Sequence, residues 1–363
     1  MKKVSLSTML VAFLGLFFLT HAACNQQQQT ASTSSPSDVT KPRVIVQLNW
    51  LHDPTFVAQY LLTASDDLAV NIHPGGPNTV PLGEVLAGRA QFAIAGADIF
   101  LKYLGEHVTP SATSDLVCVF IDFQRNPVGW VLHPDVVKNL GLDVLPTNPS
   151  KEFNKWVADQ IRTKKLKVGD KRGTESTAVW LQWRDHQSLG ADIVLEPVGY
   201  DPGIVLSAPK MLYPVYLNEQ PFRLSEKTAQ EGKGEILVID PVLDGVRLYG
   251  NVIVARRDYA TNNVALIEKF QQALRKAWLA VKANPDQAAK EVAIRYTGVS
   301  HDTVVKQVQR TLDFVFADGA VPGQMDLDSA GMWSITLRAL QDGGSVSKSL
   351  TTEQVFASLV PPK

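Results

Sequence analysis

Residues 44–60 read VIVQLNWLHDPTFVAQY, the most informative stretch of the chain. A β-branched run stops at Trp50 and at Asp53-Pro54, and an apolar segment with helical spacing resumes at Phe56. The pattern predicts a strand, a loop and a helix. Ligands of open α/β folds bind where strands end beside helix N-termini. Trp50 therefore lies either at a ligand site or in the core of an ordinary first strand–helix unit.

Predicted strands and helices alternate on both sides of a central insert, which indicates a mostly parallel sheet before the insert and a second α/β set after it. Before the insert, the predicted strands after the first are 68–72, 91–96 and 116–123, and the helices are 81–86 and 97–104. Residues 143–166 form the longer, Pro-containing insert with an amphipathic helix. After it come strands 167–169, 192–198, 210–216, 235–239 and 248–255, and helix 174–187. The remaining helical patterns are 263–283, 286–296, 301–316, 325–342 and 352–359.

The simplest topology for this order is an α/β fold in which a second lobe is inserted into the first. Residues 42–129 and 248–363 make the first lobe with its C-terminal helical segment, and residues 130–247 make the second. Crossover strands near 128–132 and 249–254 join them. Two lobes joined in this way form a hinged clamp.

The N-terminal residues predict export and anchoring rather than fold. Residues 1–24 combine Lys2 and Lys3 with a short apolar stretch and end in Ala22-Ala23-Cys24. This resembles a bacterial lipoprotein signal, in which Cys24 is lipidated; cleavage after Ala22 is the alternative, because His21 stands where such signals carry Leu. Residues 25–41 are Gln, Ser and Thr rich and predict a flexible tether. We expect a lipid-anchored protein of the periplasm or the outer face of a bacterial membrane.

Composition excludes several classes of function. Removing Lys2 and Lys3 from 35 Lys and Arg leaves 33 against 36 Asp and Glu, a net charge of −3 without a basic patch for nucleic acid. Cys118 sits in a buried-strand pattern, where we expect a small apolar residue. The sequence lacks His/Cys/Asp/Glu clusters with metal spacing and lacks nucleotide-binding or hydrolase motifs. We therefore expect neither an enzyme, a cofactor nor a metal.

Five segments in register resemble the periplasmic solute-binding proteins of ABC importers, in the branch for thiamine pyrimidine precursors, aliphatic sulfonates, nitrate and taurine. They are residues 44–60, 84–98, 123–127, 173–176 and 216–221, the last followed by Tyr249-Gly250-Asn251-Val252. The resemblance covers residues 42–300 and departs from the family at the insert 143–166. It implies a type II periplasmic binding protein, monomeric, that binds a small molecule and delivers it to a membrane permease.

Candidate ligand residues lie in the loops that this topology brings to the cleft. Trp50 offers a stacking face, while Asn49 and Asp53 offer polar groups. Glu219 is the main candidate for specificity, because a carboxylate beside an amide suits an amine-bearing heterocycle. The full set is Asn49, Trp50, Asp53, Tyr60, Gln124, Gly173, Thr174, Glu175, Ser176, Tyr216, Asn218 and Glu219.

Each of these residues also has a structural alternative. Thr174 and Asp98 could be helix caps, Tyr60 could be core, and Asp53 could serve only its Asp-Pro turn.

An aromatic face combined with a carboxylate favours a thiamine pyrimidine precursor as the ligand. Riboflavin is the rival, and a sulfonate, taurine or nitrate is less favoured because the sequence offers no convincing pair of cationic site residues. An exported ligand sensor for a membrane partner is the alternative from another class.

Overall fold

The computed structural model describes residues 41–363 except 110, 142–145, 172–173 and 361–363. Residues 41–363 form one compact unit. The signal segment, the tether, Cys24 and Gly173 lie outside the described residues. Among the residues that the structure describes, no helix is both long enough and apolar enough to cross a bilayer.

The first lobe is built on a five-stranded mixed sheet with the strand order β2-β1-β3-β10-β4. Parallel pairing joins the first three strands, and β10 pairs antiparallel with β3 and β4. The strands are β1 (Arg43–Gln47), β2 (Ala69–His73), β3 (Phe92–Gly96), β4 (Leu116–Ile121) and β10 (Asn251–Arg256). The strands β3 and β4 are buried along their whole length, which explains their continuous apolar sequence.

The second lobe repeats this arrangement with the order β7-β6-β8-β5-β9. Here β6 pairs in parallel with β7 and β8, and β5 pairs antiparallel with β8 and β9. The strands are β5 (Val128–Leu132), β6 (Lys167–Asp170), β7 (Leu195–Pro197), β8 (Met211–Tyr216) and β9 (Leu237–Ile239). This confirms the predicted α/β fold of two lobes. The sheet of the first lobe, predicted as mostly parallel, is mixed, because β10, the first strand after the chain returns to that lobe, pairs antiparallel with both of its neighbours.

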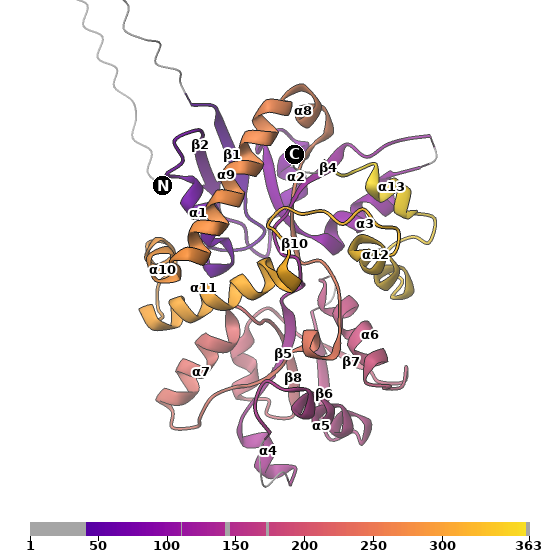
Figure 1. Cartoon of the computed structure of the whole chain (residues 1–363). Helices are drawn as coiled ribbons and strands as arrows, with labels where there is room; N and C mark the ends of the chain where they lie inside the picture. Colours follow the sequence, from indigo (N-terminus) through magenta and orange to yellow (C-terminus); the bar gives the residue numbers. More distant parts are fainter. Residues whose placement is uncertain (1–40, 110, 142–145, 172–173, 361–363) are drawn as a thin grey trace, which may run out of the picture. The chain divides into compact units, whose positions relative to one another are not determined.

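Helices follow the strands in both lobes (Figure 1). In the first lobe they are α1 (Val57–Leu62), α2 (Pro81–Leu86), α3 (Ala97–His107), α8 (Arg257–Asn262), α9 (Val264–Ala283), α10 (Pro285–Ala293), α11 (His301–Val315), α12 (Met332–Asp342) and α13 (Thr352–Phe356). In the second lobe they are α4 (Asp135–Asn139), α5 (Lys151–Arg162), α6 (Ser176–His186) and α7 (Gln220–Gln230). Short 3₁₀ turns are η1 (Pro54–Phe56), η2 (Pro202–Leu206), η3 (Pro241–Asp244) and η4 (Ala317–Gly319).

The chain passes between the lobes twice, and the two passages are hydrogen-bonded to each other. The first leads from β4 to β5 and the second from β9 to β10. The Asn126 amide donates to Leu248 O at 2.8 Å, and the Gly250 amide donates to Phe123 O at 3.1 Å. A Cβ on Gly250 would stand 2.9 Å from Arg125 O, so the close approach of the two passages requires glycine here.

The structure departs from the predicted elements at the start of α12 and at the helices α4, α7 and α8, which were not predicted. The helix expected over 325–342 begins only at Met332, because the Asp326 side chain accepts hydrogen bonds from the Asp328 and Met332 amides and holds a non-helical turn. The helix α7 was not predicted, because its apolar positions are few and Pro221 interrupts the pattern; Pro221 in fact stands in the first turn, where proline is tolerated.

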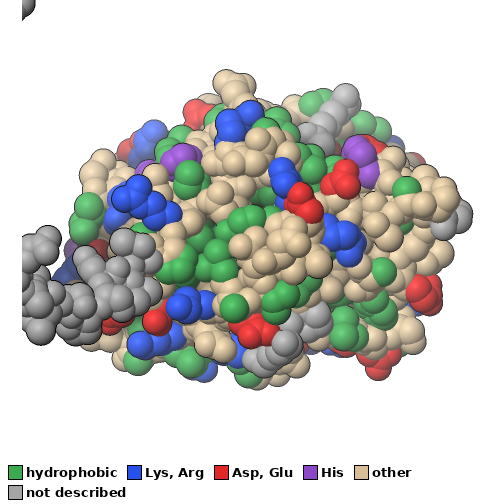
Figure 2. Space-filling view, turned by 90° about the horizontal axis from the view of Figure 1, so that it is seen from above, with side chains coloured by type: hydrophobic (Ala, Val, Ile, Leu, Met, Phe, Trp, Pro, Cys, Tyr) green, Lys and Arg blue, Asp and Glu red, His purple; other side chains and the backbone are tan. Residues whose placement is uncertain are grey.

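Surface charges agree with the near-neutral composition. On the face seen in Figure 2, basic and acidic side chains are interspersed around an apolar stretch rather than gathered by sign. This face therefore offers no patch for a polyanion.

Candidate functional site

A cavity of about 350 Å³ lies between the two lobes, at the carboxyl ends of the strands of both sheets. The loops after β1 and β2 and the junction of β3 with α3 line it from the first lobe. The loops after β6 and β7, the end of β8 and the start of α7 line it from the second. The lining residues are Asn49, Trp50, Asp53, Thr55, Phe56, Gly76, Pro77, Thr79, Val80, Pro81, Ala95, Gly96, Ile99, Val128, Lys171, Thr174, Glu175, Ser176, Tyr200, Pro214, Val215, Tyr216 and Gln220. Strand ends at an interlobe cleft are where ligands of such folds bind.

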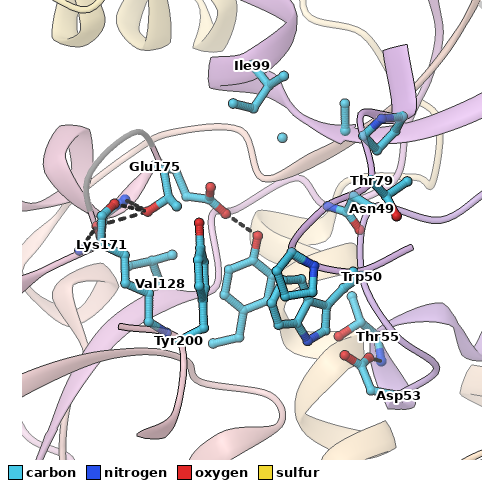
Figure 3. A pocket seen from close by; sticks show the side chains of 18 of the residues that line it. Asn49, Trp50, Asp53, Thr55, Thr79, Ile99, Val128, Lys171, Glu175 and Tyr200 are labelled. Atoms are coloured by element: carbon cyan, nitrogen blue, oxygen red, sulfur yellow. Dashed lines mark hydrogen bonds between the residues drawn. The ribbon is translucent and has the colours of Figure 1, made fainter. Parts of the chain in front are cut away.

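The wall from the first lobe is formed mainly by the loop that leaves β1. In Figure 3, Asn49, Trp50 and Asp53 lie on one side of the pocket, opposite Lys171 and Glu175. The Asn49 amide donates to Asn251 Oδ1 at 3.3 Å, while its own Oδ1 is buried without a partner. That oxygen can accept a hydrogen bond from a ligand.

The wall from the second lobe combines two aromatic residues with charged groups at the start of α6. Tyr200 faces Trp50 across the cleft, with ring centroids 5.4 Å apart at 39°. The hydroxyl of Tyr216 donates to Glu175 Oε1. A flat ligand could pack against the aromatic rings while its polar edge meets the carboxylate.

Both carboxyl groups of the cavity have raised pKa values. Burial, and then the charge of Glu219, raises the pKa of Asp53 to about 7, although its Oδ1 accepts a 2.7 Å hydrogen bond from the Thr55 amide. Burial, and then the charge of Asp98, raises the pKa of Glu175 to about 7. Near neutral pH, both groups can exchange a proton with a bound ligand.

Lys171 is the only lysine or arginine among the described residues of the lining. Burial lowers its pKa to about 8, against the attraction of Glu175 and Glu219. Its ammonium lies over the Tyr213 ring, 5.0 Å from the centroid. The described cavity therefore carries more acidic than basic groups.

Seven of the residues predicted from the sequence line the cavity together: Asn49, Trp50, Asp53, Thr174, Glu175, Ser176 and Tyr216. The hydroxyls of Thr174 and Ser176 are already used as donors within their loop. Thr174 donates to Lys171 O at 2.8 Å, and Ser176 donates to Asp170 Oδ1 at 2.7 Å. They can accept a further hydrogen bond but have no proton left to donate.

Four predicted residues do not line this cavity, and their side chains bond to other parts of the protein instead. Tyr60 is buried and holds the backbone of Asp53 through its hydroxyl. Gln124 donates to Gln324 O at 3.0 Å. Asn218 donates to Thr55 and Thr311 across the interlobe seam, both at 3.1 Å.

Glu219 is the fourth, and its partners come from both lobes. The Tyr296 hydroxyl donates to its Oε1 at 2.7 Å, and Arg223 Nε lies 3.5 Å from the same oxygen. Its position is that of an interlobe contact beside the cavity. Direct ligand contact by Glu219 stays a prediction.

Tyr200 is the contact that the sequence analysis missed, although a signal for it existed. Tyr200-Asp201-Pro202 repeats the order of Trp50 and Asp53-Pro54: an aromatic residue after a strand, followed by Asp-Pro. In both loops the Asp side chain caps a 3₁₀ turn, with Asp201 Oδ1 accepting from the Gly203 amide at 2.8 Å. Lys171 was missed because a lone loop lysine gives no signal of burial.

A metal centre is not supported by the described part of the chain. It contains no group of three or more His, Cys, Asp or Glu side chains that could hold a metal ion. Cys118 is buried, as expected, and burial raises the pKa of its thiol to about 12.

Comparison with known proteins supports the resemblance read from the sequence. Residues 212–288 match the family described as NMT1/THI5 like. No curated protein sequence matches this chain.

Solved structures match over nearly the whole chain at low identity. The periplasmic aliphatic sulphonate binding protein SsuA of Escherichia coli is 13% identical with a TM-score of 0.58, covering 87% of this chain and 97% of that one. The alkanesulfonate-binding protein SsuA of Xanthomonas axonopodis pv. citri, bound to MOPS, is 13% identical with a TM-score of 0.58, covering 90% and 99%. The CA3427 gene product of Candida albicans, described as having the generic periplasmic binding protein fold, is 11% identical with a TM-score of 0.57, covering 89% and 97%.

These matches confirm the fold class: the chain has the type II periplasmic binding protein fold. Likeness at 11 to 13% identity establishes the fold alone, because proteins of one fold bind different ligands.

Proposed function

We propose that this chain is the substrate-binding protein of an ABC importer, that it captures a small amine-bearing heteroaromatic ligand, and that a thiamine pyrimidine precursor fits best. The observation that carries the proposal is the cavity in which the Trp50 and Tyr200 rings meet the carboxyls of Asp53 and Glu175. The rings suit a flat ligand, and the carboxyls suit its amino group and ring nitrogens.

The charge balance of the cavity supports an amine-bearing ligand over an anion. A sulfonate needs donors, and the described lining offers Lys171, whose lowered pKa reduces its charge at alkaline pH. The nearby hydroxyls of Thr174 and Ser176 already donate hydrogen bonds within their own loop, so they cannot donate to an anion. Above about pH 7, where Asp53 and Glu175 are charged, an anion would also meet two buried carboxylates, and like charges in a buried site oppose one another.

An aliphatic sulfonate, taurine or nitrate is the second candidate, because two of the similar structures are sulfonate-binding proteins. Lys171 would then supply the positive charge. Riboflavin, with a larger flat ring system, is a further candidate for the same aromatic pair. An exported sensor that passes the ligand signal to a membrane partner would use the same cavity.

The location follows from the same proposal. A lipid at Cys24 would hold the protein at the outer face of a bacterial membrane or in the periplasm, and residues 25–41 would give it reach toward the permease. Replacing Cys24 by Ala should release the protein from the membrane fraction. A protein that remains there after this change would contradict the anchor.

A thermal-shift screen tests the ligand class. The purified chain with Cys24→Ala is heated with the hydroxymethyl aminopyrimidine precursor of thiamine, riboflavin, taurine and ethanesulfonate. A ligand at 100 times its Kd stabilises the folded state by about 2.7 kcal/mol. We expect the aminopyrimidine to raise the melting temperature. A shift with the sulfonates alone would replace the first proposal by the second.

A further inference from the structure

Two carboxyl groups meet where α3 of the first lobe approaches α6 of the second. Asp98 stands in the first turn of α3, and Glu175 is the N-cap residue of α6. Both point at Gly96: a Cβ built there would lie 2.3 Å from Asp98 Oδ1 and 3.6 Å from Glu175 Oε2. The two side chains are buried, with residue exposures of 3% for Asp98 and 7% for Glu175.

The hydrogen bonds of this pair leave one of its oxygens, Asp98 Oδ1, without a side-chain donor. Lys102 Nζ lies 3.2 Å from Asp98 Oδ2, and the Tyr216 hydroxyl donates to Glu175 Oε1. Asp98 Oδ1 is buried without a hydrogen-bond partner. Against the rise in pKa that burial causes, the backbone amides of Asp98 and Ile99 at the start of α3 favour the charged form of the carboxyl group. Glu175 makes no side-chain capping bond to α6, so its carboxylate is turned toward the cleft.

We propose that Asp98 and Glu175 bind one proton between them when the lobes close, so that closure, and with it ligand capture, takes up a proton. The pair belongs to different lobes, and opening of the cleft would return each carboxyl to water. Two buried carboxylates at one site oppose closure, and a shared proton removes that opposition. The device acts on the closing step and holds for any ligand of the cavity.

The other charged groups around the pair set the direction of the effect. Lys102 faces it from α3, Tyr216 from β8 and Lys171 from the loop after β6. Burial raises the pKa of Asp98 despite Lys102, and burial and Asp98 together raise the pKa of Glu175 to about 7. A group whose pKa is higher in the closed state favours closure at low pH. Closure is therefore expected to weaken as pH rises toward 7 and to level off above it.

Asp53 forms a second interlobe acid pair with Glu219, and its pKa is also raised to about 7. It adds its own pH dependence, so the wild-type profile alone does not identify Asp98 and Glu175. Variants must separate the two pairs. Glu175→Gln and Asp98→Asn remove the first pair, and Asp53→Asn removes the second.

Lobe closure can be measured without a ligand, which separates this proposal from the proposed function. The strands β2 and β7 lie at the sheet edges away from the two passages, so labels near them report closure. Dyes are attached at Asp67→Cys and Val194→Cys, both exposed, in the full chain with Cys24→Ala; the buried Cys118 stays unlabelled. Energy transfer between the dyes is recorded from pH 5 to pH 8.

We expect the ratio of closed to open molecules to fall by up to about tenfold per pH unit between pH 5 and 7. Glu175→Gln should raise the ratio at pH 8 and reduce the slope of the profile to the part that Asp53 contributes, and Asp98→Asn should do the same. Asp53→Asn should keep a pH-dependent profile. The exposed Glu152→Gln serves as the control for the Glu-to-Gln change itself and should match the parent protein.

Three results would overturn the proposal: a flat profile in the labelled parent protein, an unchanged profile in Glu175→Gln, or closure that follows the potassium concentration at every pH. The last would mean that a metal cation, and not a proton, balances the pair. If circular dichroism shows that neither Glu175→Gln nor Asp98→Asn folds, the Asp53→Asn protein alone tests the proposal. Its pH dependence must then persist.

Discussion

The loops after β1 and β6 are equivalent positions in the two lobes, and they use their acidic residues differently. Each leaves the central strand of the parallel set and enters a helix beside the cavity. Asp53 caps η1 by accepting from the Thr55 amide, whereas Glu175 leaves its helix uncapped and accepts from Tyr216. One carboxyl thus holds its own loop in shape, and the other is available to the cleft.

This difference separates stability from binding. Changes in the first loop should affect both, because Trp50 and Asp53 combine the ligand face with the cap that fixes it. Changes at Glu175 should affect binding and closure with little effect on folding. The second lobe has its own capping acid in Asp201, which stands beside Tyr200 and caps η2.

The largest effect is expected for Trp50→Ala. Loss of the indole removes one aromatic face, and we expect the Kd for the aminopyrimidine to rise by about a hundredfold, or about 2.7 kcal/mol. Trp50→Phe should recover part of the lost affinity. Tyr200→Ala, which removes a half-exposed ring, should raise the Kd by about tenfold. Titration calorimetry measures all three. Unchanged affinity in Trp50→Ala would return this residue to a packing role.

A smaller effect is expected for Glu175→Gln, which keeps the shape of the side chain and removes its charge. We expect about tenfold weaker binding of the aminopyrimidine at about pH 7.5, because the lost contact between carboxylate and amine outweighs the easier closure of this variant, and a melting temperature that does not fall. Lys171→Met is the matched change on the same loop and should leave this affinity within about threefold. A loss of affinity of about tenfold in Lys171→Met together with little change in Glu175→Gln would mean that the cavity binds an anion.

The capping role of Asp53 predicts a loss of stability. Asp53→Ala leaves the Thr55 amide without its acceptor and should lower the free energy of unfolding by about 1 kcal/mol. Asp201→Ala is the matched change at the exposed cap of η2, where water replaces the lost acceptor, and should cost less than half as much. Denaturant unfolding compares them. Equal losses would show that burial of the cap does not matter.

The smallest effect concerns pH and the first lobe. Burial raises the pKa of Asp122 to about 7, although Trp278 and Gln59 donate to it at 2.7 and 2.8 Å. A carboxyl with a raised pKa stabilises the fold below its unfolded value and loses that contribution as pH rises to about 7. Between pH 6 and 7 we expect the melting temperature to fall by about 2 °C for each such group. Asp122→Asn should reduce this slope; an unchanged slope would mean that Asp122 does not titrate in this range.

Much of the fold could be predicted because its signals are local. The buried strands β3 and β4 are continuous apolar runs, and α9 and α11 carry regular apolar stripes bounded by Asn263 and Ser300. The start of α12 could not be predicted in this way, because Asp326 overrides a helical pattern through contacts with its own loop.

The site was predictable where a motif placed residues at a strand end, as for Trp50 and Glu175. The site was not predictable where contacts with distant residues decide whether a side chain faces the cavity. Glu219 has the residue type and the loop position of a ligand contact, yet the Tyr296 hydroxyl reaches it from the first lobe and Arg223 lies beside it one turn along α7. Tyr200 required recognising that its Asp-Pro turn repeats the first one.

We expect the cleft to select an amine-bearing ring over an anion, and competitive titration calorimetry measures this preference. The chain with Cys24→Ala is titrated with the aminopyrimidine at about pH 7.5, where Glu175 and Lys171 are both mostly charged, alone and after saturation with ethanesulfonate. We predict tight binding of the aminopyrimidine that the sulfonate does not displace, and about tenfold weaker binding in Glu175→Gln. Tight sulfonate binding that excludes the aminopyrimidine, lost in Lys171→Met and retained in Glu175→Gln, would contradict the account.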